Sequence, residues 1–132
     1  MYIKHILEEK GREVVTVRPA HAIPDVLAQL AKNNIGAVIV SKDGMRVEGI
    51  ISERDIIRRL VEHGPDLLSK RVQDISLHKV YTCTPEDDIY TVMTMMRRRR
   101  IRHMPVVVGG TLCGIVSLVD ILRQHLAKAD IA

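Results

Sequence analysis

The chain carries nearly the same stretch of sequence twice. Residues 49–58 (GIISERDIIR) return as residues 114–123 (GIVSLVDILR), and residues 14–19 (VVTVRP) have a counterpart in residues 80–85 (VYTCTP). The copies are offset by 66 residues at first and by 65 residues after one deletion in a hairpin. A unit that is repeated within one chain usually packs against its copy around a pseudo-twofold axis. We therefore expect two related halves and two related sites.

The first copy has the pattern of strand, helix, strand, hairpin, strand and helix. Residues 14–17 form a short β-branched run, and residues 23–30 carry apolar side chains at the i, i+3, i+4 and i+7 spacing of an amphipathic helix. Residues 37–40 (AVIV) are continuously apolar, as in a buried strand. A Lys-Asp-Gly turn then leads to a third strand over residues 47–51, and a helix should begin near Ser52.

The second copy repeats these elements. Residues 80–84 take the place of the first strand, and Thr84 with the proline and three acids that follow it predicts a helix start. That helix bears the same apolar stripe, made of Ile89, Val92, Met93 and Met96. Residues 104–108 and 112–116 flank a Gly-Gly turn and predict a β-hairpin, after which a helix should begin near Ser117.

These elements predict a mixed α/β (α+β) fold. A helical crossover makes the first two strands of each copy parallel, and the hairpin makes the third strand antiparallel. Helices on one face of three strands leave the other face bare, so the second copy is its natural cover. We expect two pseudo-symmetric β-α-β-β-α repeats packed sheet to sheet. They comprise residues 1–66, with a lead-in helix at 3–6 and a linker at 62–66, and residues 67–132, with a matching lead-in at 72–75.

The composition is that of an ordinary globular protein, with 46% hydrophobic and 27% charged residues. No apolar run approaches the roughly 20 residues of a membrane span, and the first ten residues are too charged for a secretory signal. We expect a cytoplasmic protein.

Cys83 and Cys113 belong to no CxxC pair and the histidines have no metal spacing, so we expect buried reduced thiols and no metal. The sequence also lacks GxSxG, HExxH, Walker and GxGxxG motifs, which argues against an enzyme.

The net charge of +4 is concentrated in one place. Residues 1–66 hold ten Lys/Arg and ten Asp/Glu, whereas residues 67–132 hold ten and six. Five of the second ten are Arg97, Arg98, Arg99, Arg100 and Arg102. Three interpretations are open: a solvated helix end whose cations face the negative end of the helix dipole, a phosphate-lining role for Arg100 or Arg102, or docking onto nucleic acid. Nucleic acid is the least favoured, because the first half is neutral, Phe and Trp are absent, and no DNA- or RNA-binding motif is recognisable.

A Ser-x-x-Asp element stands at the start of the last helix of each copy, Ser52 with Asp55 and Ser117 with Asp120. Serine is a common helix N-cap, and an acid in the first turn interacts favourably with the helix dipole. A capping box would prefer Glu or Gln to Asp, which suggests another partner for the carboxylate. Its two oxygens can each accept one hydroxyl of a ribose diol, and a serine hydroxyl beside first-turn amides suits a phosphate.

Together these residues resemble the cystathionine-β-synthase-type domain, or CBS domain. The resemblance rests on the strand threonine and proline, the amphipathic helix, the apolar strand, the Gly-h-h-Ser-x-x-Asp element (h, apolar) and residues 102–106 (RHMPV) of the second copy. It extends from about residue 3 to residue 126, and two copies in register resemble the tandem arrangement called a Bateman module. The resemblance implies two pseudo-equivalent clefts between the copies that bind adenosine-containing ligands.

The resemblance also implies which residues line the clefts, since each cleft takes Ser and Asp from one copy and the strand threonine from the other. The first cleft would be lined by Ser52, Asp55, Thr82, Thr84, Ile101, Arg102 and His103. The second would be lined by Thr16, Arg18, Ile35, Gly36, Ala37, Ser117 and Asp120. Met104 and Pro105 continue the adenine-lining segment, and Arg54 is able to reach a phosphate or to form a surface ion pair. Because Arg18 and Ile39 depart from the family pattern, we expect the cleft of Asp55 and Thr84 to be the working one.

We therefore predict a regulatory module without catalytic residues that senses an adenine nucleotide such as AMP, ATP or NAD and forms a homodimer through its helices. Ligand binding would change the packing of copies or subunits and be read by a protein partner, within the limit set by the ligand's differential affinity for the two states. Two other function classes stay open. One is a nucleic-acid-binding module that uses the arginines, and the other is a ligand-free dimerisation module in which the Ser and Asp pairs are only helix caps.

Overall fold

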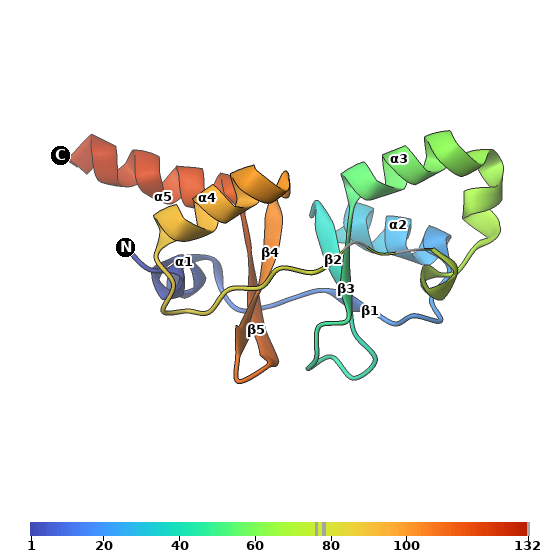
Figure 1. Ribbon diagram of the computed structural model, residues 1–132, viewed down its shortest axis with the longest axis horizontal. Helices are drawn as coiled ribbons and strands as arrows, with labels where there is room; N and C mark the ends of the chain where they lie inside the picture. Colours follow the sequence, from blue (N-terminus) through green and yellow to red (C-terminus); the bar gives the residue numbers. More distant parts are fainter. Residues whose placement is uncertain (76, 78, 132) are drawn as a thin grey trace. The chain divides into compact units, whose positions relative to one another are not determined.

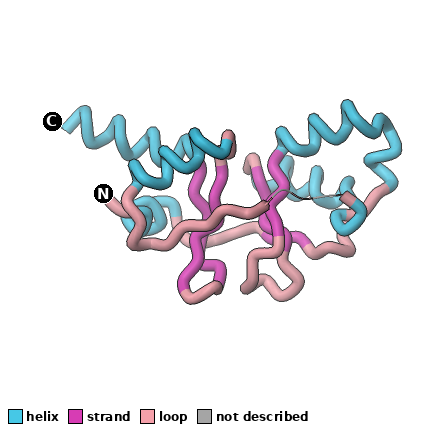
Figure 2. Tube along the Cα trace, in the orientation of Figure 1, coloured by secondary structure: helices cyan, strands magenta, loops and turns pink. Residues whose placement is uncertain are grey.

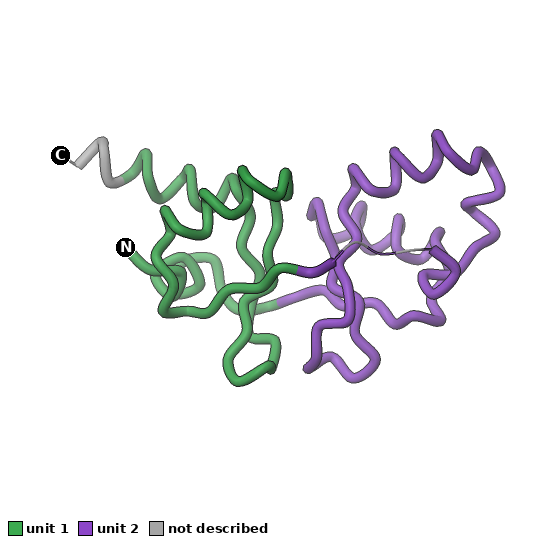
Figure 3. Tube along the Cα trace, viewed as in Figure 1, with its two compact units in different colours: residues 1–13, 81–132 green, residues 14–80 purple. Residues whose placement is uncertain are grey.

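The computed structural model describes residues 1–75, 77 and 79–131, the last four of them by their backbone alone. The chain divides into two compact units (Figure 3). Unit 2 is the continuous segment 14–80, whereas unit 1 combines residues 1–13 with residues 81–132. Each unit is a small sheet with helices and has its own apolar core.

Unit 2 is built on a three-stranded sheet in the order β1-β2-β3 (Figure 1, Figure 2). Its elements are β1 (Thr16–Val17), α2 (Ile23–Asn33), β2 (Ala37–Val40), β3 (Gly49–Ser52), α3 (Glu53–His63) and the 3-10 turns η1 (Gly64–Ser69) and η2 (Val72–Asp74). β1 is parallel to β2 because α2 connects them, and β3 returns antiparallel to β2 through a hairpin loop. The predicted stripe of α2 faces the core, where Ile23, Val26 and Leu30 are buried.

Unit 1 is built on a β-hairpin. Its elements are α1 (Ile3–Lys10), α4 (Ile89–Arg99), β4 (His103–Val108), β5 (Thr111–Ser117) and α5 (Leu118–Ile131). β4 and β5 pair antiparallel through a turn at Gly109 and Gly110, both of which have positive φ. On the other edge of β4, Cys83 makes a single parallel bridge to Val106. Ile89, Val92 and Met96 of α4 are buried, so this helix packs by the stripe that the repeat predicts.

The predicted fold class is confirmed, because helices and strands are mixed and each repeat has one small sheet with the expected strand directions. Three local predictions need correction. Residues 80–84 form one bridge and no regular strand, and the third strand starts at Gly49, two residues later than expected. The expected linker is largely helical: α3 continues to His63 and is followed by η1, whose Leu67 is fully buried.

Helix α4 also begins later than the sequence suggests. Asp88, and not Thr84, is its N-cap: the carboxylate accepts the backbone N–H groups of Tyr90 (3.0 Å) and Thr91 (3.3 Å). Thr84 lies in a turn ahead of the helix, where its N–H donates to the carboxylate of Asp87 (2.8 Å). A short acidic side chain that follows the turn competes well with a hydroxyl for the cap position.

Each lead-in segment packs in the compact unit that contains the other repeat. Helix α1 precedes the first repeat in sequence, yet Ile3, Ile6 and Leu7 are buried in the core of unit 1 with the second repeat. The segment 67–80 precedes the second repeat, yet Leu67 and Val72 are buried in the core of unit 2. The compact units therefore differ from the sequence division between residues 66 and 67.

A repeated glycine marks where each lead-in packs. A β-carbon on Gly114 of β5 would lie 2.7 Å from Cδ2 and 3.1 Å from Cδ1 of Leu7 in α1. In unit 2, a β-carbon on Gly49 of β3 would collide with Cδ1 of Leu77. The glycine that opens both Gly-h-h-Ser elements thus allows a lead-in leucine to approach the strand closely.

Candidate functional site

Ser52 and Asp55 form a reciprocal capping box where β3 ends and α3 begins. The backbone N–H of Asp55 donates to Ser52 Oγ (3.2 Å). Asp55 Oδ2 accepts both the backbone N–H (2.9 Å) and the hydroxyl (2.8 Å) of Ser52. Both residues are partly buried. The box satisfies backbone N–H groups that the first turn of a helix leaves without an intrahelical partner.

The same box recurs in unit 1 at the start of α5. The backbone N–H of Asp120 donates to Ser117 Oγ (3.1 Å), and Asp120 Oδ2 accepts the backbone N–H of Ser117 (2.8 Å). Aspartate therefore reaches its capping partner in both units, which corrects the argument that this shorter acid points to some other partner. A carboxylate has about four lone-pair sites, so a capping role does not by itself exclude a further donor.

Asp120 carries an additional cation that the sequence does not indicate. Lys10, the last residue of α1, donates from Nζ to Asp120 Oδ2 (2.8 Å) and to the carbonyl oxygen of Ile115 (3.0 Å). Burial by itself raises the pKa of Asp120, but hydrogen bonds from Lys10 and Ser117 and the charge of Lys10 outweigh that effect, so the pKa lies below its usual value. Asp120 is thus an ionised, paired carboxylate at neutral pH.

The segment before the central strand lies against the box in each unit. In unit 2, the carbonyl of Gly36 accepts the N–H of Glu53 (2.9 Å), and Ala37 pairs with Ser52 across β2 and β3. In unit 1, the carbonyl of Arg102 accepts the N–H of Leu118 (2.8 Å). We call these groupings the Asp55 half-site (Ile35, Gly36, Ala37, Ser52, Asp55) and the Asp120 half-site (Ile101, Arg102, His103, Ser117, Asp120).

Within each unit, the segment before the central strand lies beside the Ser-x-x-Asp box of its own repeat. His103 pairs with Ser117 across β4 and β5, just as Ala37 pairs with Ser52 across β2 and β3. The family resemblance assigns residues 101–103 to the cleft of Ser52 and residues 35–37 to that of Ser117, which concerns contacts across the two repeats. The pairing of residues across the repeats stays a prediction.

The remaining predicted residues fall into two groups. Arg18, Arg54, Thr82 and Thr84 are exposed, and Thr16 is partly buried in β1. Met104 and Pro105 are buried, and Met104 is 0% exposed within the core of unit 1. Contact of a ligand with Met104 is therefore limited to its backbone, because the side chain is occupied in holding β4 against the helices.

The arginines lie where the sequence places them, at the end of α4. Arg97, Arg98 and Arg99 form the last turn, and Arg100 is the C-cap in the left-handed conformation with φ 55°. Arg102 is exposed, as are the other four. The guanidinium of Arg99 lies 4.7 Å from the ring centroid of Tyr81, a cation–π contact that holds one of the five side chains in place.

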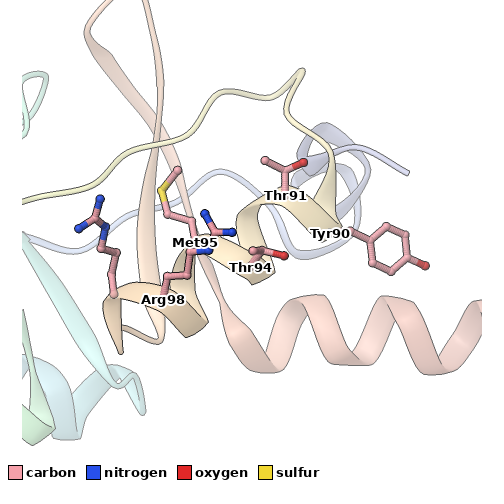
Figure 4. A pocket seen from close by; sticks show the side chains of 6 residues that line it. Tyr90, Thr91, Thr94, Met95 and Arg98 are labelled. Carbon is pink, nitrogen blue, oxygen red and sulfur yellow. The ribbon is translucent and has the colours of Figure 1, made fainter.

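A hollow of about 410 Å³ follows the outer side of the same helix (Figure 4). It is lined by Tyr90, Thr91, Thr94, Met95, Arg98 and Arg99. None of the predicted nucleotide-binding residues is in this set. The hydroxyls and guanidinium groups suit an anion, and all six lining residues belong to the single helix α4.

Both cysteines are free thiols. Burial, with the charge of Asp87 and the neighbouring Cys113, raises the pKa of Cys83 to about 12. Cys83 is therefore an uncharged, buried thiol at neutral pH, as the sequence predicts, whereas Cys113 is partly buried.

The family model of the CBS domain matches the chain twice, over residues 5–62 and 72–126. The chain belongs to the CBS domain family. Its two CBS repeats form a tandem CBS, or Bateman, module.

This CBS pair resembles solved structures of other CBS-domain proteins in both sequence and fold. It is 34% identical to a CBS-domain containing protein from Agrobacterium tumefaciens, with a TM-score of 0.89, over 95% of this chain and 99% of that one. It is 28% identical to a CBS domain protein from Pyrobaculum aerophilum solved in complex with AMP, with a TM-score of 0.82, over the whole of both chains.

Curated relatives are longer than this chain. The CBS domain-containing protein CBSX3, mitochondrial, of Arabidopsis thaliana is 36% identical over 129 residues, which is 92% of this chain and 63% of the relative. The arabinose 5-phosphate isomerase KdsD of Yersinia pestis is 28% identical over 113 residues, which is 86% of this chain and 34% of the isomerase. The chain thus spans less than two-thirds of the length of these relatives.

Proposed function

We propose that this CBS pair is a regulatory module that binds an adenine nucleotide, such as AMP, ATP or NAD, at its Ser-x-x-Asp elements. The carboxylate of Asp55 or Asp120 would accept the ribose hydroxyls, and the serine hydroxyl and first-turn amides would face the phosphate. The backbone of residues 35–37 or 101–105 would meet the adenine. Residues of the first strands would complete the site, as the family resemblance implies: Thr16, Arg18, Thr82 and Thr84.

The observation that carries the proposal is the repetition of one geometry in both units. Each unit has a carboxylate and a serine at the N-terminus of a helix, next to a backbone segment that is bonded to the same helix. The positive end of a helix dipole favours a phosphate at such a place. The AMP bound to the Pyrobaculum relative supports the class of ligand.

The role we propose is regulatory and not catalytic. A bound nucleotide would shift the module between packing states to the extent that its affinity differs between them, and a protein partner would respond to that shift. The isomerase activity in the name of one relative is not carried over, since the chain spans 34% of that protein.

A thermal-shift panel of AMP, ADP, ATP, NAD and S-adenosylmethionine tests the proposal. A ligand at one hundred times its Kd stabilises the folded state by about 2.7 kcal/mol. For a chain of this length that free energy raises the Tm by about 5–12 °C. The proposal is wrong if none of the five compounds shifts the Tm.

Asp55→Asn separates ligand binding from helix capping. Asparagine keeps an oxygen that accepts the N–H of Ser52 but loses an acceptor for a ribose hydroxyl, so nucleotide binding should weaken by about 10- to 100-fold. The matched control is Asp25→Asn, which removes the same charge from the exposed first turn of α2. If the module only dimerises, isothermal titration calorimetry with a nucleotide should give the same result for both variants.

We further propose that the module forms a homodimer through the outer faces of α3 and α5. Ile57 and Val61 on α3 are 62% and 82% exposed, and Leu122 and Leu126 at the equivalent positions of α5 are 43% and 61% exposed. Apolar side chains that recur on the surface of both repeats favour a protein–protein contact.

The nucleic-acid alternative makes a different prediction. Binding through the arginines at the end of α4 would weaken steeply with salt and would be lost when residues 97–100 are replaced.

In the part of the chain that the structure describes, none of the helices has the length and apolar character of a membrane span. The cytoplasmic location stays a prediction.

A further inference from the structure

Lys10 joins two parts of unit 1 that are far apart in sequence. Its ammonium group reaches Asp120 Oδ2 (2.8 Å) and the carbonyl oxygen of Ile115 (3.0 Å), so it bridges the end of β5 and the first turn of α5. The side chain of Asp120 is only 12% exposed and that of Lys10 is 34% exposed. The ion pair is therefore partly shielded from water, and a shielded pair is stronger than one on an open surface.

The ammonium group is bound where the proposed ligand needs an acceptor. Asp120 Oδ2 already accepts the N–H of Ser117, and Lys10 is the second donor on the same oxygen. A carboxylate that holds a vicinal diol offers one oxygen to each hydroxyl. With one oxygen engaged by a cation and an amide, Asp120 can offer the diol only one well-placed acceptor.

Other contacts keep Lys10 in this position. Helix α1 is anchored by Ile3, Ile6 and Leu7 in the core of unit 1, and Leu7 packs on Gly114 of β5. The amide of Gln124 on α5 also donates to the carboxylate of Glu9, next to Lys10. Because the backbone of α1 is already in place, only the side chain of Lys10 has to be ordered when it pairs with Asp120.

We propose that Lys10 is an intramolecular competitor that occupies the Asp120 half-site and weakens nucleotide binding there. The inference rests on the proposed function of the Ser-x-x-Asp elements. A nucleotide that binds at Asp120 must displace the ammonium group, so its apparent affinity is the intrinsic affinity multiplied by the fraction of molecules in which the ion pair is open. Displacement would also remove the two contacts that Lys10 makes with β5 and α5, which connects ligand binding to the end of the lead-in helix.

Lys10→Met tests this competition, because methionine keeps an unbranched apolar stem and removes the ammonium group. Isothermal titration with AMP, ATP and NAD should show nucleotide binding at the Asp120 half-site tightened by about 2- to 5-fold, the effect of one partly shielded ion pair. Adding Asp120→Asn to Lys10→Met should abolish the gain. Lys4→Met is the matched control, since Lys4 lies on the same helix but pairs with the exposed Glu86 (3.3 Å).

Each outcome of the titration supports or overturns the competitor model. If the wild type binds nucleotide and Lys10→Met binds it with the same or lower affinity, the competitor model is overturned while the proposed function stands; lower affinity would make Lys10 a ligand contact. If neither protein binds any of the three nucleotides, both proposals are overturned. Should Lys10→Met fold poorly by circular dichroism, Lys10→Gln replaces it, since glutamine keeps a donor for the carbonyl of Ile115 and carries no charge.

Discussion

At the scale of single residues, Asn34 and Arg100 show how the two repeats differ. They occupy equivalent positions, 66 residues apart, and each is the C-cap of its helix in the left-handed conformation, with φ 51° and 55°. Asparagine tolerates this conformation well, whereas most other side chains with a β-carbon are disfavoured there. The run of arginines therefore ends on a residue that costs stability in unit 1.

Arg100→Asn should stabilise the protein relative to Arg100→Gln, since both variants remove the charge and only asparagine suits the left-handed conformation. The expected difference is about 0.5–1 kcal/mol, or roughly 2–5 °C in Tm. Asn34→Gln should lower the Tm by a similar amount, as the reverse change in unit 2. Differential scanning calorimetry measures both. Equal Tm values for the Asn and Gln variants at position 100 would contradict this account.

At the scale of elements, the contact of α1 with β5 depends on the absence of a side chain at Gly114. A methyl group on Gly114 would lie 2.7 Å from Cδ2 of Leu7, so the leucine side chain would have to shift. Leu7 is 1% exposed and packed in the core, so that shift would disturb its neighbours. The repeated glycine is thus a packing requirement of the lead-in helix as well as part of a recognisable motif.

Gly114→Ala should destabilise the protein by about 1–3 kcal/mol through overpacking. Leu7→Val removes a methylene from the contact and should relieve part of that cost, so the two changes together should be less harmful than the sum of each alone. Urea unfolding of the two single variants and the double variant measures the coupling. Strictly additive free energies of unfolding would show that α1 does not pack on β5 in this way.

At the scale of the whole molecule, the proposed dimer depends on apolar side chains that both repeats expose. Val61→Glu and Leu126→Glu place a charge in the apolar surfaces of α3 and α5, so each should shift the protein toward a monomer of 14.9 kDa in light scattering coupled to size exclusion. Val108→Glu is the control, because Val108 is 57% exposed on the β-hairpin and not on these helices. A monomeric wild type, or a control that dissociates as readily, would refute the proposed contact.

Much of the architecture follows from local patterns in the sequence. The stripe from Ile23 to Leu30, the apolar run of residues 37–40 and the Gly-Gly turn predict their elements because each depends on neighbours a few residues away. The caps are harder to predict: Asp88 replaces Thr84 at the start of α4 because several polar residues in a row compete for one position.

Local patterns are enough to predict a repeated α/β unit with a Ser-x-x-Asp element at the start of each final helix. Three features become visible only in the folded chain: each lead-in segment packs with the other repeat, residues 101–103 lie beside Ser117, and Lys10 pairs with Asp120. Periodicity and capping are interactions between near neighbours, whereas the apolar face of α1 has the same pattern whichever core buries it, and an ion pair between residues 110 positions apart leaves no trace in either local sequence.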